Sequence, residues 1–308
     1  MYIRSIRLVT LAMTLLASVL VPASDLFVSS EGTHEIKRYD GTSGAYVGDF
    51  VGAGSGGLVT PEGVRFGPDG NLYVSSSGTH QVLRYNGATG AFMGVFASGG
   101  GLLRPWGITF GTDGNLYVSS SLTNEVLRYN GSSGAFMGVF ASSAGMLVPD
   151  GVEFGPDGNL YVTATNSHAV YRFNGTTGAS MGVFASGGLA FPGETSFGND
   201  GNLYTTSFST GTIEKFDGSS GAALGPFASV TSPVGSRWGS DGRLYISSYT
   251  TNTVVRTDGT TTTTFASGGG LVNPTNMTFA PVPEPSGLLV LSVGALLARR
   301  RRRKQRSL

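Results

Sequence analysis

Cysteine is absent from the 308-residue chain, and histidine occurs only as His34, His80 and His168. The lack of cysteine excludes disulfide scaffolds, thiolate metal sites and cysteine nucleophiles. A metal site built from several histidines would use the entire supply. Charged residues form only 13% of the chain, about half the usual share. Aromatic residues, at 10%, argue against a disordered chain.

The few charges are unevenly distributed. Seven basic residues lie in residues 299–308, and two more, Arg4 and Arg7, lie in the first 23 residues. The body between these ends holds 11 Lys and Arg against 18 Asp and Glu, which gives it a net charge of −7. Because an acidic body has no broad attraction for nucleic acid, we expect no nucleic-acid partner.

Residues 1–23 have the features of a secretory signal peptide. Arg4 and Arg7 form a basic start, an apolar run covers residues 8–20, and the segment Val21-Pro22-Ala23 follows at the usual cleavage spacing. The apolar run is too short for a stable membrane span. A buried N-terminal helix is the alternative, but the composition changes abruptly at Ser24. We therefore predict that the protein is exported.

The C-terminal residues 282–308 combine a Pro-Glu-Pro motif, a short apolar stretch and an arginine cluster. These parts are Pro283, Glu284 and Pro285, then residues 287–298, then a cluster that begins with Arg299, Arg300 and Arg301. Twelve apolar residues hardly span a bilayer, but they can anchor briefly with the arginines left in the cytoplasm. This order closely resembles the PEP-CTERM sorting signal of Gram-negative bacteria.

The resemblance implies a processing enzyme and a destination. An exosortase would recognise the Pro-Glu-Pro motif and remove the tail after transient anchoring in the inner membrane. The mature protein would then reach the cell surface or the extracellular matrix. An ordinary C-terminal anchor with a basic flank is the alternative, and it also implies export. We therefore divide the chain into a signal peptide (1–23), a folded body (24–281) and a sorting tail (282–308).

The body is an internal repeat. A phrase of the form Asp-Gly-Asn-Leu-Tyr-Val recurs, with its leucine at positions 26, 72, 116, 160, 203 and 244, which are 41 to 46 residues apart. Each unit contains four short stretches of β-branched and aromatic residues bounded by glycine-rich turns, a pattern typical of strands. No helical period interrupts them. Four antiparallel strands in this length is the size of one propeller blade.

The phase of the repeat predicts how the blades close into a ring. The first unit begins with its second strand at Leu26, and the missing first strand appears in residues 274–279. Pairing these two segments completes the sixth blade and removes an exposed sheet edge. The sequence therefore predicts an all-β fold: a six-bladed β-propeller with four antiparallel strands per blade, closed by a C-terminal strand that pairs with the N-terminal blade.

The units resemble NHL repeats over about residues 25–280, in the patterns Pro-x-Gly-Ile, Asp-Gly-Asn-Leu-Tyr-Val and His-x-Val-x-Arg-Tyr. They are also similar to streptogramin lyase-like and gluconolactonase-like (SMP-30-like) propellers. In NHL-like repeats a histidine commonly tightens the turn before the third strand. The corresponding positions here are His34, His80, Asn124, His168, Gly211 and Asn252. We interpret these residues as structural, because repetition alone places them, and we expect the three histidines to lie in separate blades.

The first strand of each blade should line the central channel, and the residues after its initial proline differ between blades. These candidate channel residues are Glu62, Trp106, Asp150, Glu194 and Asn276. By analogy with gluconolactonase-like propellers, the carboxylates and the amide would hold Ca²⁺ or Mg²⁺, and Trp106 would stack on a sugar or another flat ligand. The alternative is a channel mouth that is polar only because water fills it.

Two functions remain open from the sequence. The first is a non-enzymatic exported propeller that binds exopolysaccharide or surface proteins, with hydroxyl-rich loops over residues 75–79, 119–124 and 247–252 exposed for hydrogen bonding to sugars. The second is a metal-dependent lactonase or lyase at the channel mouth. No histidine lies on a first strand, so the base of a streptogramin lyase-like enzyme has no candidate. A pure matrix spacer would leave no trace to separate it from the first.

Overall fold

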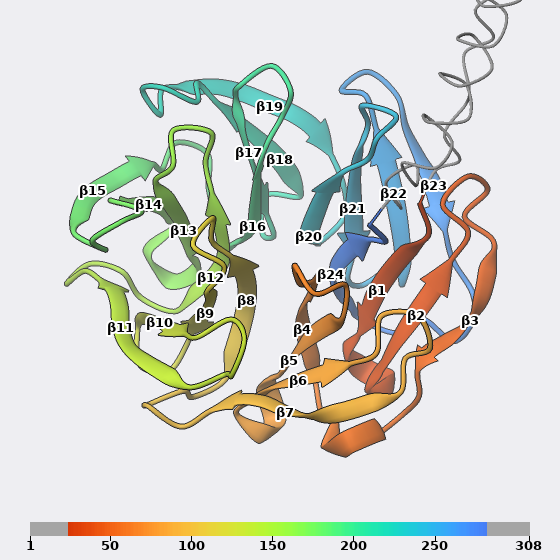
Figure 1. Cartoon of the computed structure of the whole chain (residues 1–308). Coiled ribbons are helices and arrows are strands. Elements are labelled where there is room, and N and C mark those ends of the chain that lie inside the picture. The colour runs from red at the N-terminus through yellow and green to blue at the C-terminus, as the bar shows by residue number, and fades with distance from the viewer. Residues whose placement is uncertain (1–23, 282–308) are drawn as a thin grey trace, which may run out of the picture.

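Six four-stranded antiparallel sheets surround a central axis in the computed structural model, which describes residues 24–281 (Figure 1). From the axis outwards the blades are β24 (Pro274–Phe279), β1 (Leu26–Ser30), β2 (Glu35–Tyr39), β3 (Tyr46–Val51); β4 (Pro61–Phe66), β5 (Leu72–Ser76), β6 (Gln81–Tyr85), β7 (Phe92–Ser98); β8 (Pro105–Phe110), β9 (Leu116–Ser120), β10 (Glu125–Tyr129), β11 (Phe136–Ser142); β12 (Pro149–Phe154), β13 (Leu160–Ala164), β14 (Ala169–Phe173), β15 (Ser180–Ala185); β16 (Pro192–Phe197), β17 (Leu203–Ser207), β18 (Thr212–Phe216), β19 (Ala223–Ser229); and β20 (Pro233–Trp238), β21 (Leu244–Ser248), β22 (Thr253–Thr257), β23 (Thr262–Ala266).

The helical segments of residues 24–281 are short 3₁₀ turns: η1 (Glu31–Thr33), η2 (Ser55–Gly57), η3 (Ser77–Thr79) and η4 (Thr165–Ser167). None of the helices in this part of the chain is long and apolar enough to cross a membrane. The predicted signal peptide and sorting tail, with Pro283, Glu284, Pro285 and the arginines from Arg299 onward, lie outside the described residues.

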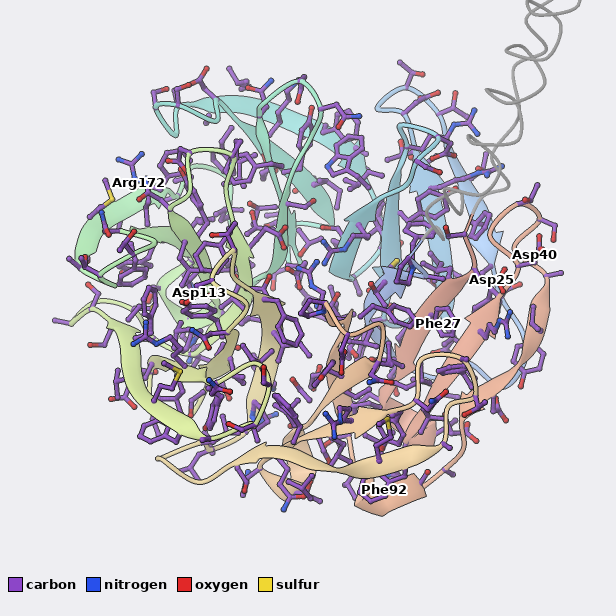
Figure 2. The ribbon with its side chains drawn as sticks, viewed as in Figure 1. Asp25, Phe27, Asp40, Phe92, Asp113 and Arg172 are labelled. Atoms are coloured by element: carbon purple, nitrogen blue, oxygen red, sulfur yellow. The ribbon has the colours of Figure 1, made fainter. Side chains whose placement is uncertain are left out.

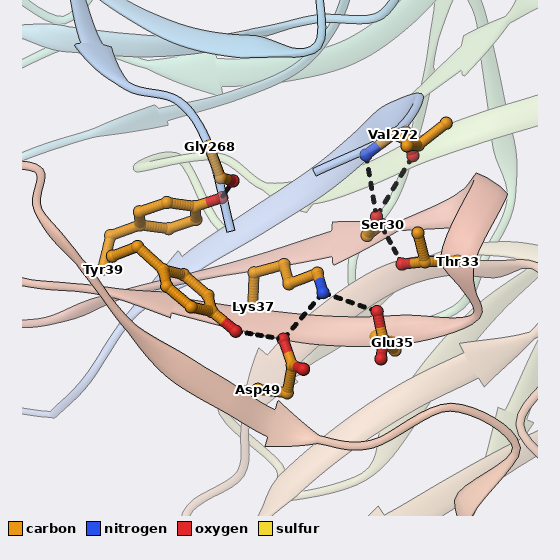
Figure 3. Close-up of polar contacts among 9 residues, drawn as sticks. Ser30, Thr33, Glu35, Lys37, Tyr39, Asp49, Gly268 and Val272 are labelled. Carbon is orange, nitrogen blue, oxygen red and sulfur yellow. Dashed lines mark hydrogen bonds and ion pairs between the residues drawn. The ribbon is translucent and has the colours of Figure 1, made fainter. Parts of the chain in front are cut away.

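The predicted closure of the ring is confirmed. Strand β24 pairs with β1, with Leu26 opposite Phe279 and Val28 opposite Met277. Beyond the ladder, the Ser30 hydroxyl both accepts from the Val272 amide (3.1 Å) and donates to the Val272 carbonyl (3.2 Å), as Figure 3 shows. The two ends of the body are thus joined by side-chain as well as main-chain hydrogen bonds, so β1 is not left as an open edge.

The closing blade also contains a buried ionic cluster that the other blades lack. Lys37 is 3% exposed and donates to Glu35 Oε2 (2.5 Å) and to Asp49 Oδ1 (2.7 Å) (Figure 3). Burial alone would lower the pKa of Lys37, but the two carboxylates outweigh it and the pKa is raised. The equivalent residues of the next two blades are Leu83 and Leu127, so this cluster marks the N-terminal blade chemically.

The repeated Asp-Gly phrase forms the turn between the first and second strands of a blade. In the blade of β4, the Asn71 amide donates to Asp69 Oδ1 (3.0 Å), and Gly70 has a φ of +75°, which favours glycine. The Tyr73 hydroxyl donates to Asp69 Oδ2 (3.0 Å). Four other blades repeat this bond, and Asp113, one of the acceptors, is marked in Figure 2. The aspartates therefore anchor turns.

The second-strand aromatic ring forms the contact between neighbouring blades. Tyr73 packs edge-on between Phe96 of its own blade (4.7 Å between ring centroids) and Phe110 of the next blade (5.0 Å). All six blades repeat this arrangement, with Phe27 in the N-terminal blade (Figure 2) and Trp238 replacing one phenylalanine. Each edge-to-face pair contributes about 0.5–1.5 kcal/mol beyond the effect of its buried area. The contacts between blades therefore stabilise the propeller evenly around its circumference.

The shared histidine position links each blade to the next. His34, His80 and His168 have φ values of +61°, +60° and +52°, and each Nδ1 accepts a backbone N–H from the residue before the next blade's initial proline, at 2.9–3.0 Å. Asn124 does the same with the Val148 amide (2.7 Å). The histidines lie in three separate blades, and each acts as an acceptor at a blade junction. This confirms their structural interpretation.

Candidate functional site

The six first strands (β4, β8, β12, β16, β20 and β24) pack against one another around the axis and line a narrow channel. Close approach depends on glycine: a Cβ added to Gly107 would lie 2.4 Å from the Asp150 carbonyl oxygen of the neighbouring first strand. Each first strand also has a register shift near its start, where three residues oppose two of the second strand, as between Pro149 and Val152. Such a bulge re-aims side chains, here at the end where the prolines lie.

All five channel residues predicted from the sequence line one small cavity at this end. Glu62, Trp106, Asp150, Glu194 and Asn276 surround a volume of about 10 Å³, which is about the room needed for one water molecule. The structure therefore brings together residues separated by more than 200 positions in the chain.

The carboxyl groups of this channel cavity are destabilised in their charged form. Burial, together with the carboxylates of Glu31 and Asp150, raises the pKa of Glu62 well above its usual value. Burial and the carboxylate of Glu194 raise the pKa of Asp150 to about 8. Arg104 opposes both shifts but does not cancel them. Strongly perturbed carboxyls in a cavity are typical of functional sites.

Glu194 and Asn276 meet across the channel one layer deeper. Asn276 Nδ2 donates to Glu194 Oε2, and Asn276 Oδ1 accepts from the Met277 amide (2.8 Å). Glu194 is 3% exposed, and its Oε1 has no hydrogen-bond partner among the described residues. Burial raises the pKa of Glu194 even though Arg65 and Arg237 lower it.

A third layer, which the sequence analysis missed, crosses the channel near the other end of the first strands. Arg65 Nη2 forms an ion pair with Glu153 Oε2, and Arg237 Nη1 lies 3.6 Å from the same oxygen. Burial would raise the pKa of Glu153, but the two guanidinium groups hold it below its usual value. Burial and the like charge of Arg65 lower the pKa of Arg237 to about 10. Aligning the fifth residue of every first strand would have revealed this alternation of Arg, Glu and Arg in blades that are not adjacent.

A larger cavity, here called the vestibule, opens beside the channel cavity and has a volume of about 320 Å³. Its walls are mainly apolar: Trp106, Phe191, Pro192, Phe208, Pro233 and Val234. It shares Trp106, Asp150 and Val234 with the channel cavity, so the two spaces adjoin. The guanidinium carbon of Arg104 lies 5.0 Å from the Trp106 ring centroid, and Trp106 Nε1 is buried without a partner among the described residues.

The donor set does not fit the predicted Ca²⁺ or Mg²⁺ ion in this arrangement. Both polar atoms of the Asn276 side chain are engaged, one by Glu194 and one by a backbone amide. Within residues 24–281, no group of three or more His, Cys, Asp and Glu side chains is placed to hold a metal ion. We therefore derive no reaction step through a metal.

The hydroxyl-rich segments were expected to form exposed loops, and this was wrong for their first residues. Ser75, Ser119 and Ser247 are fully buried in β5, β9 and β21. The Ser119 hydroxyl accepts from the Gly107 amide (2.8 Å). The bulge of each first strand interrupts its backbone ladder, and in four blades a hydroxyl of the second strand accepts from an amide left there. Ser119 and Ser247 therefore support the channel wall, whereas Ser75 Oγ has no partner among the described residues. All three serines are buried and are not available to sugars.

Comparisons with known proteins identify the fold. No family model and no curated protein matches the sequence. Among solved structures, a chain of a nidogen/laminin complex matches with a TM-score of 0.70 and 16% identity, covering 84% of this chain and 99% of that one. A catalytically inactive virginiamycin B lyase from Staphylococcus aureus, solved with quinupristin, has a TM-score of 0.62 and 15% identity over 85% of this chain and 94% of its own. A streptogramin B lyase has a TM-score of 0.58 and 16% identity, covering 72% of each chain. At these identities the likeness shows a common propeller fold.

Proposed function

We propose that this chain is an exported, surface- or matrix-associated propeller that binds another protein through the face around the vestibule and catalyses no reaction itself. Export and exosortase processing rest on the signal-peptide and Pro-Glu-Pro features of the sequence. Protein binding rests on the apolar character of one face of the ring. Because first strands run the same way in every blade, the segments that precede their prolines all lie on this face, which we call the mouth face.

The main support for protein binding is a set of exposed apolar side chains on the mouth face. Its members and their exposed fractions are Val59 (37%), Leu103 (41%), Leu122 (57%), Leu147 (46%), Phe191 (45%) and Phe208 (36%). Two pairs are joined by their backbones: Leu122 N donates to Leu103 O (3.4 Å), and Phe208 N donates to Phe191 O (3.2 Å). Single exposed apolar residues are ordinary, but a set gathered on one face beside an apolar cavity, with Phe191 and Phe208 in the cavity wall, is typical of a protein-binding surface.

Two further observations support binding over catalysis. Each histidine accepts a hydrogen bond at Nδ1 from a backbone amide at a blade junction, so its role is structural. The nidogen/laminin structure is a complex between proteins, and the match covers 99% of the chain of that complex. A similar propeller scaffold is therefore compatible with binding another protein.

The experiment compares labelled protein binding to intact host cells for three forms. The double variant Phe191→Ser, Phe208→Ser removes two aromatic anchors from the mouth face. The control, Met137→Ser, removes an equally exposed apolar residue (44%) from the outer strand β11. Loss of central aromatic contacts costs about 2 kcal/mol or more at binding hot spots, so the double variant should bind at least about tenfold more weakly. The control should bind like the wild type.

The nature of the partner is tested on the same cells. Protease treatment of the cells should abolish binding, whereas enzymatic removal of exopolysaccharide should leave it intact. Equal binding by the double variant would overturn the role of the mouth face. Binding that survives protease and disappears with the polysaccharide would overturn the protein partner. Retention of the chain in the cytoplasm would overturn export.

A further inference from the structure

The charged groups around the channel divide into a balanced deep layer and an unbalanced mouth layer. In the deep layer, Arg65 and Arg237 face the carboxyls of Glu153 and Glu194. In the mouth layer, Glu62 and Asp150 interact with a single guanidinium, that of Arg104, and Glu31 adds a further carboxylate near Glu62. Glu31 accepts a hydrogen bond from the Tyr249 hydroxyl (2.8 Å). The mouth layer therefore has more carboxyl groups than cations.

An unpartnered buried atom points to the same location. Glu194 lines the channel cavity, is 97% buried and leaves Oε1 without a hydrogen-bond partner among the described residues. This oxygen lies on the side of Gly151, 3.2 Å from where a Cβ on that glycine would be. Gly151 directly follows Asp150, so the free oxygen lies on the side of the channel that carries the mouth carboxyls. A buried acceptor without a donor costs about 1–3 kcal/mol, which a ligand that donates to it would recover.

The vestibule supplies the complementary apolar contacts. It shares the walls Trp106, Asp150 and Val234 with the channel cavity, so one occupant would have an apolar stem in the vestibule and its head at the carboxyls. Arg104 already places a cation over the Trp106 ring at 5.0 Å, and its side chain is exposed. The aromatic wall is thus suited to a positive charge.

We propose that the protein partner inserts a lysine side chain at the centre of the mouth face, with its methylene stem in the vestibule and its ammonium group at Glu62, Asp150 and Glu194. The ammonium is compact and carries three donors, which suits a cavity of about 10 Å³ bordered by three carboxyl groups. A planar guanidinium with five donors does not suit so small a space. This inference rests on the proposed function, because it names what the partner presents.

Binding of an ammonium ion requires the carboxyls in their charged form, so affinity should depend on pH. The groups that face Asp150 are Glu62, Glu194 and Arg104, with Arg65, Glu153 and Arg237 below them. The pKa of Asp150 is about 8, and that of a lysine ammonium is about 10.4. Affinity should therefore rise about fifty-fold between pH 6 and pH 8 as Asp150 loses its proton while the lysine keeps its own.

The test uses the purified protein and two probes that share one stem and differ only at the ε-nitrogen. Nα-acetyl-lysine methylamide carries the ammonium, whereas its Nε-acetylated form has the same stem and no charge. Binding is followed by NMR titration at pH 8. We expect the charged probe to bind at least about tenfold more tightly, and Asp150→Asn to abolish this preference. The control variant Asp217→Asn changes an exposed turn aspartate whose equivalents in three blades are Asn86, Asn130 and Asn174, so it should keep the preference.

The outcomes separate this inference from the proposed function. Equal binding of both probes, or a preference that survives Asp150→Asn, would overturn lysine insertion. Absence of probe binding while cell binding remains sensitive to Phe191→Ser, Phe208→Ser would overturn lysine insertion and leave the protein-binding function standing. If cell binding is also insensitive to that double variant, both fail. Thermal unfolding of each variant verifies that it is folded.

Discussion

The substitution Asp150→Asn offers a direct measure of the electrostatic cost of the channel mouth. Asp150 lies on β12 beside Glu62 and Glu194, and burial together with the Glu194 carboxylate raises its pKa to about 8. Asparagine has almost the same shape and can occupy the same space without a charge. We therefore expect the variant to be folded and to be more stable than the wild type at neutral and alkaline pH.

The sign and size of the effect follow from linkage. A carboxyl with a higher pKa in the folded than in the unfolded state keeps its proton longer when folded, so its contribution to stability falls as pH rises from about 4 towards 8. One such group costs at most about 1.4 kcal/mol per pH unit, or about 4 kcal/mol between pH 5 and pH 8. Because water reaches the mouth and screens part of the repulsion, we expect the advantage of the variant to grow by about 1–3 kcal/mol over this range.

The assay is urea unfolding of wild type, Asp150→Asn and Asp217→Asn at pH 5 and pH 8. Asp217 caps an exposed turn through the amides of Ser219 and Ser220, where asparagine serves equally well in other blades. Its variant should therefore follow the wild type between these pH values. An advantage of Asp150→Asn that is the same at pH 5 and pH 8 would refute the view that the mouth carboxyls strain the fold. The expected gain in stability would accompany the loss of lysine recognition.

Three other predictions concern the scaffold. Glu153→Gln leaves two guanidinium groups without their counter-charge and should lower the free energy of unfolding, measured by urea unfolding, by about 2–4 kcal/mol. In the wild type this stabilisation should disappear as pH falls below about 4, because the pKa of Glu153 is depressed in the folded protein. Tyr161→Phe removes the hydroxyl that donates to Asp157 (3.0 Å) and should cost about 1 kcal/mol in the same assay. Asn124→Ala removes the acceptor of the Val148 amide and should lower the midpoint temperature of thermal unfolding. Asn124→His should largely keep that temperature, because histidine fills this position in three blades. Equal midpoint temperatures for the two variants would contradict the role of this position in linking blades.

The blade count and the closure could be predicted because each repeat carries its own local signals. The buried second strand and the initial proline recur in every unit and the Asp-Gly turn in five of the six, and each acts within a few residues of itself. The absence of a first strand before Leu26 and its presence in β24 then required pairing of the two ends. The aspartate and histidine positions were likewise interpretable, because repetition separates scaffold residues from individual ones.

The electrostatics of the channel could be predicted only in part. Glu62, Asp150 and Glu194 were found because they interrupt the repeat within two residues of its proline, and they do line one cavity. The ion cluster of Arg65, Glu153 and Arg237 escaped notice because its members come from blades that are not adjacent in the chain. The exposure of Ser75 and Ser119 was misjudged because their burial inside the second strands, and the bulge amide that engages the Ser119 hydroxyl, exist only in the paired sheet.

The amino-acid sequence alone determined the six units, their strands and their order, since these depend on local turn chemistry and on the alternation of apolar side chains. Only the closed ring decided which side chains share the axis, how deeply they are buried and which of them lack a counter-charge. Those properties depend on distances between strands about 40 or more residues apart, and the pKa of a carboxyl responds to its neighbours in space. The acids of the mouth become a candidate binding site through that proximity.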